Sequence, residues 1–225
     1  MLIVLEGLDG AGKSTQLRMV TSCLSDRGRK VEYLHFPRYD APVYGELIGK
    51  FLRGDFGAIG QVHPQLVALL FAEDRREAAA TIRRWMEEGR VVVLDRYVYS
   101  NIAFQCAKLT SAEEAVALRE WIFDLEYNHY GIPRPTLNLF LDVPIGFVDA
   151  KLHNSRKGGD RSYLQGKSDI HEADIRFQEK VRALYLEQCA RDAAFIRIDC
   201  ADAQNRMLPA AEIFARIRTQ IDSIL

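Results

Sequence analysis

Cysteine is scarce in this sequence, and its spacing argues against two classes of protein. The four cysteines among the 225 residues are Cys23, Cys106, Cys189 and Cys200. They form no CxxC pair and no cysteine–histidine spacing of a zinc site, so we expect neither a structural zinc ion nor a disulfide scaffold. Isolated thiols are typical of a reducing compartment, and we therefore expect a cytoplasmic protein.

Long apolar runs and an excess of charge of either sign are also missing. The N-terminal run Met1–Leu5 is apolar, but it has no basic segment before it and is too short for a signal peptide or a membrane span. The 30 Lys and Arg residues face 31 Asp and Glu residues, which gives a net charge of −1. This balance supplies no overall attraction to nucleic acid or to an anionic membrane, so we expect neither as a partner.

A glycine-rich segment follows the N-terminal apolar run and fits the pattern GxxxxGKS. Glycines let the backbone approach a ligand closely, and successive N–H groups then form an anion site at the start of the next helix. In such a P-loop the lysine reaches the outer phosphates and the serine hydroxyl ligates Mg²⁺. The predicted ATP-binding residues are Gly7, Asp9, Gly10, Ala11, Gly12, Lys13, Ser14 and Thr15.

Strand-like and helical patterns alternate along the chain. The expected strands are Leu2–Glu6, Lys30–His35, Arg90–Asp95, Leu137–Asp142 and Ala194–Asp199. The expected helices are Lys13–Asp26, Pro64–Glu88, Ser111–Tyr130, Gly146–Asn154, Ser168–Arg191 and Leu208–Leu225. Most of the strands are nearly all apolar, as strands buried on both faces are. The alternation predicts an α/β P-loop NTPase fold, with a central five-stranded parallel sheet flanked by helices, in one domain over residues 1–225.

The segment from Ser155 to Ser162 is polar, basic and rich in glycine. Such a composition usually means a solvated surface turn. In a P-loop protein, a basic segment can also close over the phosphates and exclude water from the reaction. We favour a lid at about 154–168 and keep the surface turn as the alternative.

Charged side chains lie at the ends of two of the expected strands, where ligands of such sheets bind. Asp95 ends the third strand and resembles the second acidic element of P-loop enzymes, which holds Mg²⁺ directly or through water. Arg38 follows the second strand and Arg96 the third, and their guanidinium forks suit a second phosphate group. For each arginine alone, a surface ion pair is the alternative.

A candidate base pocket lies on the long expected helix. Phe71 and Arg75 are spaced i, i+4 and project from one helix face. An aromatic ring can stack on a planar base while a guanidinium reaches a base carbonyl. The alternative is a core phenylalanine beside a solvated arginine.

Taken together, these segments resemble the thymidylate kinases of the nucleoside-monophosphate kinase family. The resemblance covers nearly the whole chain: the P-loop with Asp9, the FPR segment ending at Arg38, LLFxxDR ending at Arg75, DRYxxS from Asp95 to Ser100, and a lid followed by a helix. It implies transfer of the γ-phosphoryl of ATP to thymidine monophosphate, with Mg²⁺, for dTTP synthesis. It also suggests a homodimer.

The resemblance further implies an acceptor site. Arg38 and Arg96 would bind the phosphate, Phe71 would stack on thymine and Arg75 would contact its O4, while Asn101 would contact the pyrimidine edge. The implied acceptor residues are Asp9, Arg38, Phe71, Arg75, Arg96, Ser100 and Asn101.

The family divides by the position of one further catalytic arginine. One type carries it in the P-loop, where this chain has Gly10, and the other carries it in the lid. This lid contains Arg156, Lys157 and Arg161, which makes the chain similar to the lid-arginine type common in bacteria; we take Arg156 as the first choice of the three. The expected catalytic residues are Lys13, Arg96, Arg156 and Asp9.

Two acids after the lid, Asp169 and Glu172, have two interpretations. Asp169 could cap a helix with Glu172 at its third position, as in a capping box. The resemblance instead places acids of this segment near the acceptor phosphate, its metal or the sugar, and both interpretations stay open. The expected metal ligands are Ser14, Asp95, Asp9 and Glu172.

Two other functions are weighed against the kinase. A deoxynucleoside kinase would phosphorylate a sugar hydroxyl and would have little use for Arg38 and Arg96 as a phosphate clamp. A P-loop ATPase switch would need neither these arginines nor a base pocket. The sequence favours the nucleoside-monophosphate kinase.

Overall fold

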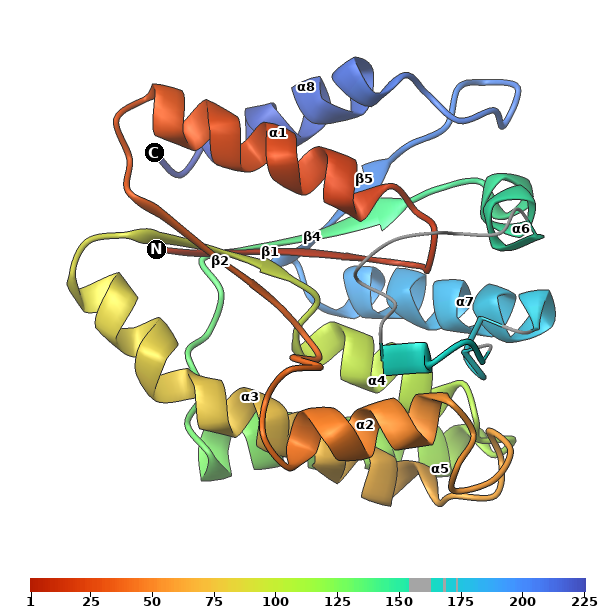
Figure 1. The fold of residues 1–225 in the computed structure, drawn as a ribbon. Helices are drawn as coiled ribbons and strands as arrows, with labels where there is room; N and C mark the ends of the chain where they lie inside the picture. Colours follow the sequence, from red (N-terminus) through yellow and green to blue (C-terminus); the bar gives the residue numbers. More distant parts are fainter. Residues whose placement is uncertain (154–162, 168, 173) are drawn as a thin grey trace.

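The structure, a computed structural model, describes residues 1–153, 163–167, 169–172 and 174–225. Within these ranges five parallel strands form one sheet in the order β2-β3-β1-β4-β5 (Figure 1). The strands are β1 (Leu2–Gly7), β2 (Val31–His35), β3 (Val91–Asp95), β4 (Leu137–Asp142) and β5 (Phe195–Asp199). The predicted fold class is therefore confirmed.

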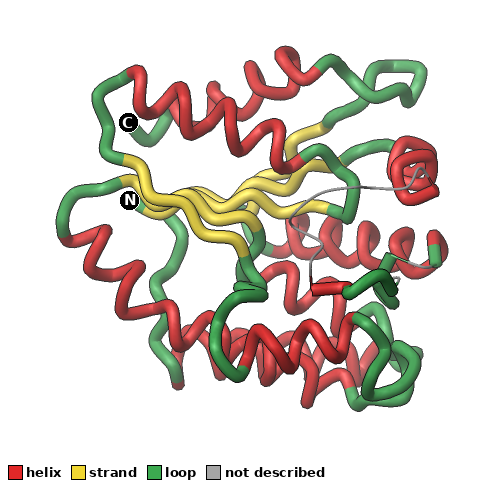
Figure 2. The backbone as a smooth tube through the Cα atoms, viewed as in Figure 1, coloured by secondary structure: helices red, strands yellow, loops and turns green. Residues whose placement is uncertain are grey.

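Helices cover both faces of the sheet, which gives three layers (Figures 1 and 2). One face carries α1 (Lys13–Asp26) and α8 (Ala210–Asp222). The other carries α3 (Pro64–Glu87), α4 (Val98–Cys106) and α7 (Ile175–Arg191). Since all strands run in the same direction, the segments that follow them meet at one edge of the sheet.

The remaining helices lie outside these layers or at the strand ends. They are α2 (Tyr44–Leu52), α5 (Ala112–Phe123), the π-helical turn η1 (Asp124–His129) and α6 (Ile145–His153). The predicted helix Ser111–Tyr130 thus consists of α5 and η1, which follow each other without a break. None of the helices in the described ranges is long and apolar enough to cross a membrane.

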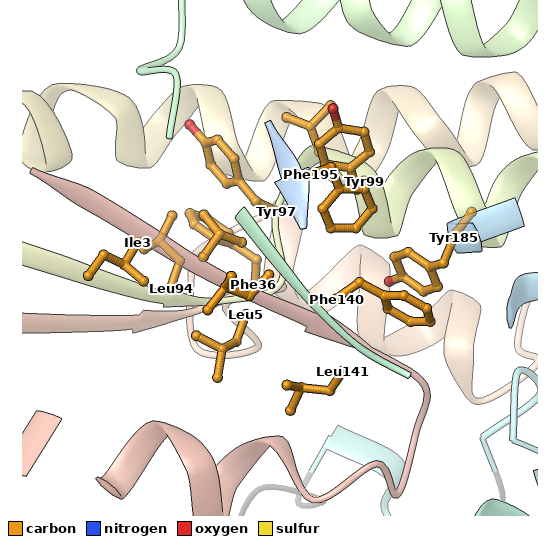
Figure 3. Close-up of a cluster of buried hydrophobic side chains, with 14 of the residues drawn as sticks. Ile3, Leu5, Phe36, Leu94, Tyr97, Tyr99, Phe140, Leu141, Tyr185 and Phe195 are labelled. Atoms are coloured by element: carbon orange, nitrogen blue, oxygen red, sulfur yellow. The ribbon is translucent and has the colours of Figure 1, made fainter. Parts of the chain in front are cut away.

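The core explains why the central strands are almost entirely apolar. All residues of β1, β3 and β4 are buried, because helices pack on both sides of these strands. Figure 3 shows Ile3, Leu5 and Leu94 together in this core, and the rings of Phe140 and Tyr185 stack with centroids 4.6 Å apart. A frame of this kind holds the loops at its carboxyl edge in fixed positions.

Two helices were not predicted, and one was given a wrong start. Helix α4 is buried along its whole length, so it shows no polar face and no amphipathic period. Helix α2 is short and contains two glycines, which lowers its helix propensity. Helix α7 begins at Ile175 and not at Ser168, because Asp174 is its N-cap and accepts a hydrogen bond from the N–H of Arg176 at 2.9 Å.

Candidate active site

The P-loop connects β1 to α1 at the carboxyl edge of the sheet. Gly10 and Gly12 have φ angles of 78° and 81°, a conformation that side-chain-bearing residues rarely adopt. Gly12 is the N-cap of α1, so the loop ends at the positive end of that helix dipole. The hydroxyl-bearing Ser14 is exposed in the first turn. The loop thus has the backbone form of a phosphate site.

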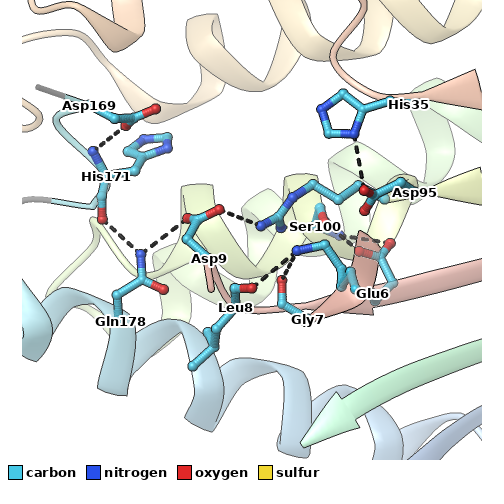
Figure 4. A network of polar contacts seen from close by, with 12 residues as sticks. Glu6, Gly7, Leu8, Asp9, His35, Asp95, Ser100, Asp169, His171 and Gln178 are labelled. Carbon is cyan, nitrogen blue, oxygen red and sulfur yellow. Dashed lines mark hydrogen bonds and ion pairs between the residues drawn. The ribbon is translucent and has the colours of Figure 1, made fainter. Parts of the chain in front are cut away.

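Lys13 is folded back over the P-loop. Its Nζ donates to the carbonyl oxygens of Gly7 at 3.4 Å and Leu8 at 3.1 Å (Figure 4). Burial of the ammonium, together with the nearby charge of Arg96, lowers the pKa of Lys13 to about 8. The side chain of Lys13 is therefore held against the P-loop.

Asp95 at the end of β3 presents one paired and one unpaired oxygen. Its Oδ2 lies 3.2 Å from Nδ1 of His35, whereas Oδ1 is buried and has no hydrogen-bond partner in the described part of the chain. Burial raises the pKa of this carboxyl, but the charge of Lys13 and the hydrogen bond from His35 outweigh it and hold the pKa below its usual value. An ionised carboxylate with an unpaired oxygen fits a water molecule bound to a magnesium ion.

The other two predicted metal ligands are Asp9 in the P-loop and Glu172 after the expected lid. Asp9 accepts a hydrogen bond from Arg96, and Glu172 is half-buried in the turn after Asp169. In the ranges that the structure describes, no three His, Cys, Asp or Glu side chains gather as a metal cluster. The acidic residues thus offer single ligands, and a bound phosphate would have to complete the coordination.

A pocket opens beside the P-loop. Six of the seven predicted acceptor residues line it: Asp9, Phe71, Arg75, Arg96, Ser100 and Asn101. The other lining residues are Phe36, Pro37, Tyr39, Leu52, Phe104, Gln105, Tyr163, Asp169 and His171. Of these, sequence reasoning had considered only Asp169 for this site, as one of two interpretations. The structure therefore brings residues from distant segments into one pocket.

Arg96 stands between this pocket and the P-loop. Its Nη2 donates to Asp9 at 2.7 Å, its Nη1 donates to Ser100 at 3.1 Å, and its guanidinium carbon lies 4.9 Å from the ring centroid of Phe104. The φ angle of Arg96 is 68°, which is rare for a residue with a side chain. Backbone strain of this kind persists where the surroundings fix it, commonly at functional sites.

Sequence reasoning missed Glu6, which binds the segment that follows Arg96. This carboxylate is fully buried and accepts hydrogen bonds from the N–H groups of Tyr97 at 2.9 Å and Ser100 at 3.2 Å. It also accepts from the hydroxyls of Ser100 and, at 3.2 Å, Tyr185. Burial raises its pKa. The signal for it was present, since Glu6 is the one charged residue in an otherwise apolar strand.

The part of the pocket near Arg75 contains a buried ion pair. Arg75 is 2% exposed, and its Nε and Nη2 donate to the carboxylate of Glu126 at 2.5 and 2.7 Å. Asn101 donates from Nδ2 to Glu126 at 3.0 Å and to the carbonyl oxygen of Ala68 at 3.0 Å. Arg75 is therefore not a solvated surface residue. Glu126 lies 51 residues further along the chain, and no local pattern pointed to it.

Arg38 is the predicted acceptor residue that does not line the pocket. Its Nε donates to Asp74 at 2.8 Å and its Nη2 donates to Glu77 at 2.6 Å, so α3 holds it. Its backbone N–H also donates to Asp74, at 2.9 Å. The guanidinium of Arg38 is thus bound by acids of α3 and does not line the pocket, whereas Arg96 does.

Two tyrosines and Asp169 form the wall of the pocket near the expected lid. The rings of Tyr39 and Tyr163 stack with centroids 3.7 Å apart, and the hydroxyl of Tyr163 donates to Asp169 at 2.7 Å. Asp169 also accepts the N–H of His171 at 2.7 Å, so it caps a turn and not helix α7 (Figure 4). Burial and the nearby charge of Asp9 raise its pKa to about 7.

The basic residues of the expected lid, Arg156, Lys157 and Arg161, lie outside the described residues. Of the range 154–168, the structure describes 163–167.

Comparison with known proteins points to a single family. The family model for thymidylate kinase matches residues 5–207. The chain is 34% identical over 194 residues to the thymidylate kinase of Mycobacterium tuberculosis, with 85% of this chain and 86% of that protein covered. It is 35% identical over 144 residues to the human thymidylate kinase, with 64% of this chain and 61% of that protein covered.

A solved structure agrees with these sequence matches. The thymidylate kinase of Candida albicans superposes with a TM-score of 0.74 at 25% identity. The superposition covers 99% of this chain and 91% of that one.

Proposed function

This chain belongs to the thymidylate kinase family, and we propose that it transfers the γ-phosphoryl group of ATP to thymidine 5′-monophosphate, giving thymidine diphosphate and ADP for dTTP synthesis. One observation supports this reaction above the others. Asp9 belongs to the P-loop and also lines the acceptor pocket, where its carboxylate pairs with Arg96. A phosphate bound at Arg96 would therefore lie beside the triphosphate in the P-loop.

ATP would be held by the backbone of the P-loop and by Lys13. The N–H groups of Gly10 to Thr15 would bind the phosphates, and Lys13 would exchange its carbonyl partners Gly7 and Leu8 for phosphate oxygens. The acceptor phosphate is already an anionic nucleophile, so the reaction needs no general base. Lys13 and Arg96 would stabilise the charge that spreads over the transferring group.

Magnesium would be bound between Ser14 and Asp95. The exposed hydroxyl of Ser14 would be a direct ligand, and the unpaired oxygen of Asp95 would hold one of the metal's water molecules. Asp9 and Glu172 are proposed as further ligands on the acceptor side. When bound, the ion would neutralise charge on the phosphate oxygens.

Thymidine monophosphate would occupy the pocket beside the P-loop. Its phosphate would bind Arg96, whose guanidinium already contacts Ser100 and Asp9. It would also bind Arg38, once the guanidinium of Arg38 has moved away from Asp74. Phe71 would stack on the thymine ring. Arg75 and Asn101 lie where they could contact the O4 and N3–H edge of the base.

The proposal extends to features that lie outside the described residues or outside one chain. We take residues 1–225 as one kinase domain of the lid-arginine type, with a lid over about 154–168 and Arg156 as its catalytic arginine. The enzyme would be a homodimer and would work in the cytoplasm, where its four free cysteines would stay reduced.

Assaying ADP release by a coupled reaction tests the proposal. Thymidine, thymidine monophosphate and the other deoxy- and ribonucleoside monophosphates are offered in turn with ATP and Mg²⁺. We expect thymidine monophosphate to give the highest kcat/KM. Preference for thymidine would instead indicate a deoxynucleoside kinase, and ATP hydrolysis that no monophosphate stimulates would indicate a switch.

A further inference from the structure

We propose that Glu126 is a positioning residue that fixes the hydrogen-bonding polarity of the base-reading side chains, so that the site selects a uracil-type ring over a cytosine-type ring. This inference rests on the proposed function, because it takes the pocket as the site of a pyrimidine monophosphate. Glu126 does not line the pocket and acts only through Arg75 and Asn101, which do.

The orientation of the Asn101 amide follows from its two partners. The carbonyl oxygen of Ala68 and the carboxylate of Glu126 both lie 3.0 Å from one end of the amide, and both can only accept. That end must be Nδ2, because an oxygen there would face two acceptors. The other end, Oδ1, is buried and has no hydrogen-bond partner in the described residues. Asn101 therefore offers the pocket an acceptor.

The carboxylate of Glu126 also determines which N–H groups of Arg75 are left to bind a ligand. Glu126 accepts from Nε at 2.5 Å and from Nη2 at 2.7 Å in a two-point ion pair. Among the hydrogen bonds between described residues, none involves Nη1, so this nitrogen is the donor left for a ligand. Both side chains are almost fully buried, with Arg75 2% and Glu126 0% exposed, which leaves the pair little freedom.

The acceptor Oδ1 of Asn101 and the donor Nη1 of Arg75 together match one class of pyrimidine. Thymine and uracil carry a donor at N3–H and an acceptor at O4, whereas cytosine carries an acceptor at N3 and a donor at its amino group. A cytosine ring would place its N3 acceptor against the acceptor Oδ1 of Asn101, and its amino donor against the donor Nη1 of Arg75. Buried polar groups left without partners commonly reduce binding or turnover by about tenfold to several hundredfold.

A carboxylate is required at position 126 because three N–H groups converge on it. They come from Nε and Nη2 of Arg75 and from Nδ2 of Asn101. A glutamine in the same place has one acceptor oxygen and brings two N–H groups of its own. It cannot satisfy all three donors, so at least one base-reading side chain has to turn or shift.

The test compares dUMP with dCMP, which differ at the N3 and position-4 edge but both lack the methyl group of thymine. The wild type, Glu126→Gln and a control, Asp142→Asn, are assayed for kcat/KM with each acceptor. The carboxylate of Asp142 is a suitable control because it is buried, accepts from Arg182 at 2.6 Å and Arg197 at 2.7 Å, and does not line the pocket.

We expect Glu126→Gln to lower the dUMP-to-dCMP ratio of kcat/KM by about tenfold or more, while Asp142→Asn leaves the ratio within about twofold. An unchanged ratio in a Glu126→Gln enzyme that still turns over dTMP would overturn the inference and leave the proposed function intact. A wild type without dTMP turnover would overturn the proposed function itself. If Glu126→Gln does not fold, Glu126→Asp is assayed in its place; its carboxylate is retracted by one methylene, and an unchanged ratio would likewise reject the role of Glu126.

Discussion

Nη2 of Arg96 lies 2.7 Å from Oδ1 of Asp9, and this contact joins the P-loop to the segment after β3. The second oxygen of Asp9 accepts a hydrogen bond from Gln178 of α7 at 3.3 Å (Figure 4). The pair therefore connects three segments that are far apart in the sequence. It also places a fixed guanidinium where the two phosphate groups of the proposed reaction would meet.

The first prediction concerns this guanidinium. Arg96→Lys keeps the positive charge but loses the planar fork that now bonds both Asp9 and Ser100. We expect kcat/KM for thymidine monophosphate to fall about 10²-fold to 10³-fold in steady-state assays, since a charge-stabilising group is lost from the transition state. Circular dichroism serves as the folding control. Wild-type kinetics in a folded Arg96→Lys enzyme would contradict the assignment.

The second prediction concerns Lys13. Lys13→Ala removes a buried ammonium whose pKa is lowered to about 8. We expect kcat to fall about 10³-fold, because the lysine no longer reaches the transferring phosphoryl group. We also expect no loss in melting temperature, because burying this charge is unfavourable in the absence of ATP. An enzyme that retains turnover would exclude the P-loop assignment, and one that unfolds would show that Lys13 is structural.

The third prediction distinguishes a ligand-binding arginine from a structural one. Arg38→Ala should raise the KM for thymidine monophosphate about tenfold or more and leave the KM for ATP nearly unchanged, since Arg38 would contact only the acceptor phosphate. Arg76→Ala is the matched control, because Arg76 also forms an ion pair on α3, with Glu73 at 2.5 Å, and does not line the pocket. Equal effects of the two variants would remove Arg38 from the acceptor site.

The sequence predicted the sheet and the P-loop because their signals are local. An apolar strand that ends at Gly7 and runs into a glycine-rich turn needs no distant contact to be recognised. Phe71 and Arg75 were noticed from their helical spacing, which is also a local signal, although a core phenylalanine beside a solvated arginine fits the same spacing. These signals, together with the resemblance to a known family, led to six of the fifteen residues that line the pocket.

The residues that sequence reasoning missed act across long separations. Glu6 binds Tyr97 and Ser100, more than 90 residues away, and Glu126 binds Arg75 across 51 residues. Glu126 has ordinary neighbours in the sequence, and only folding shows that it is buried and shared between partners. Glu6 stands out as the one charged residue of an apolar strand, but only folding shows which groups it binds. The start of α7 was misplaced for a related reason, because Asp169 and Asp174 are both plausible caps and packing chooses between them.

The last prediction is a pH dependence of stability that comes from Asp169. Its pKa in the folded state is about 7, raised from 3.8 first by burial and then by the charge of Asp9. Between these two values the folded protein holds a proton that the unfolded chain has released. The contribution to the free energy of unfolding is therefore fully present below about pH 4 and is lost as the pH rises through 7.

Measuring melting temperatures of the wild type and Asp169→Asn from pH 5 to 7.5 isolates this contribution, because the amide does not titrate. We expect the wild type to lose on the order of 2 kcal/mol relative to Asp169→Asn across this range. The variant Asp9→Asn lacks the neighbouring charge, so burial alone raises the pKa of Asp169, and by less. Its loss of stability with rising pH should therefore be complete at a lower pH than in the wild type. Parallel pH profiles for the wild type and Asp169→Asn would mean that Asp169 is already ionised in the folded protein at pH 5, with Tyr163 and the N–H of His171 stabilising its charge.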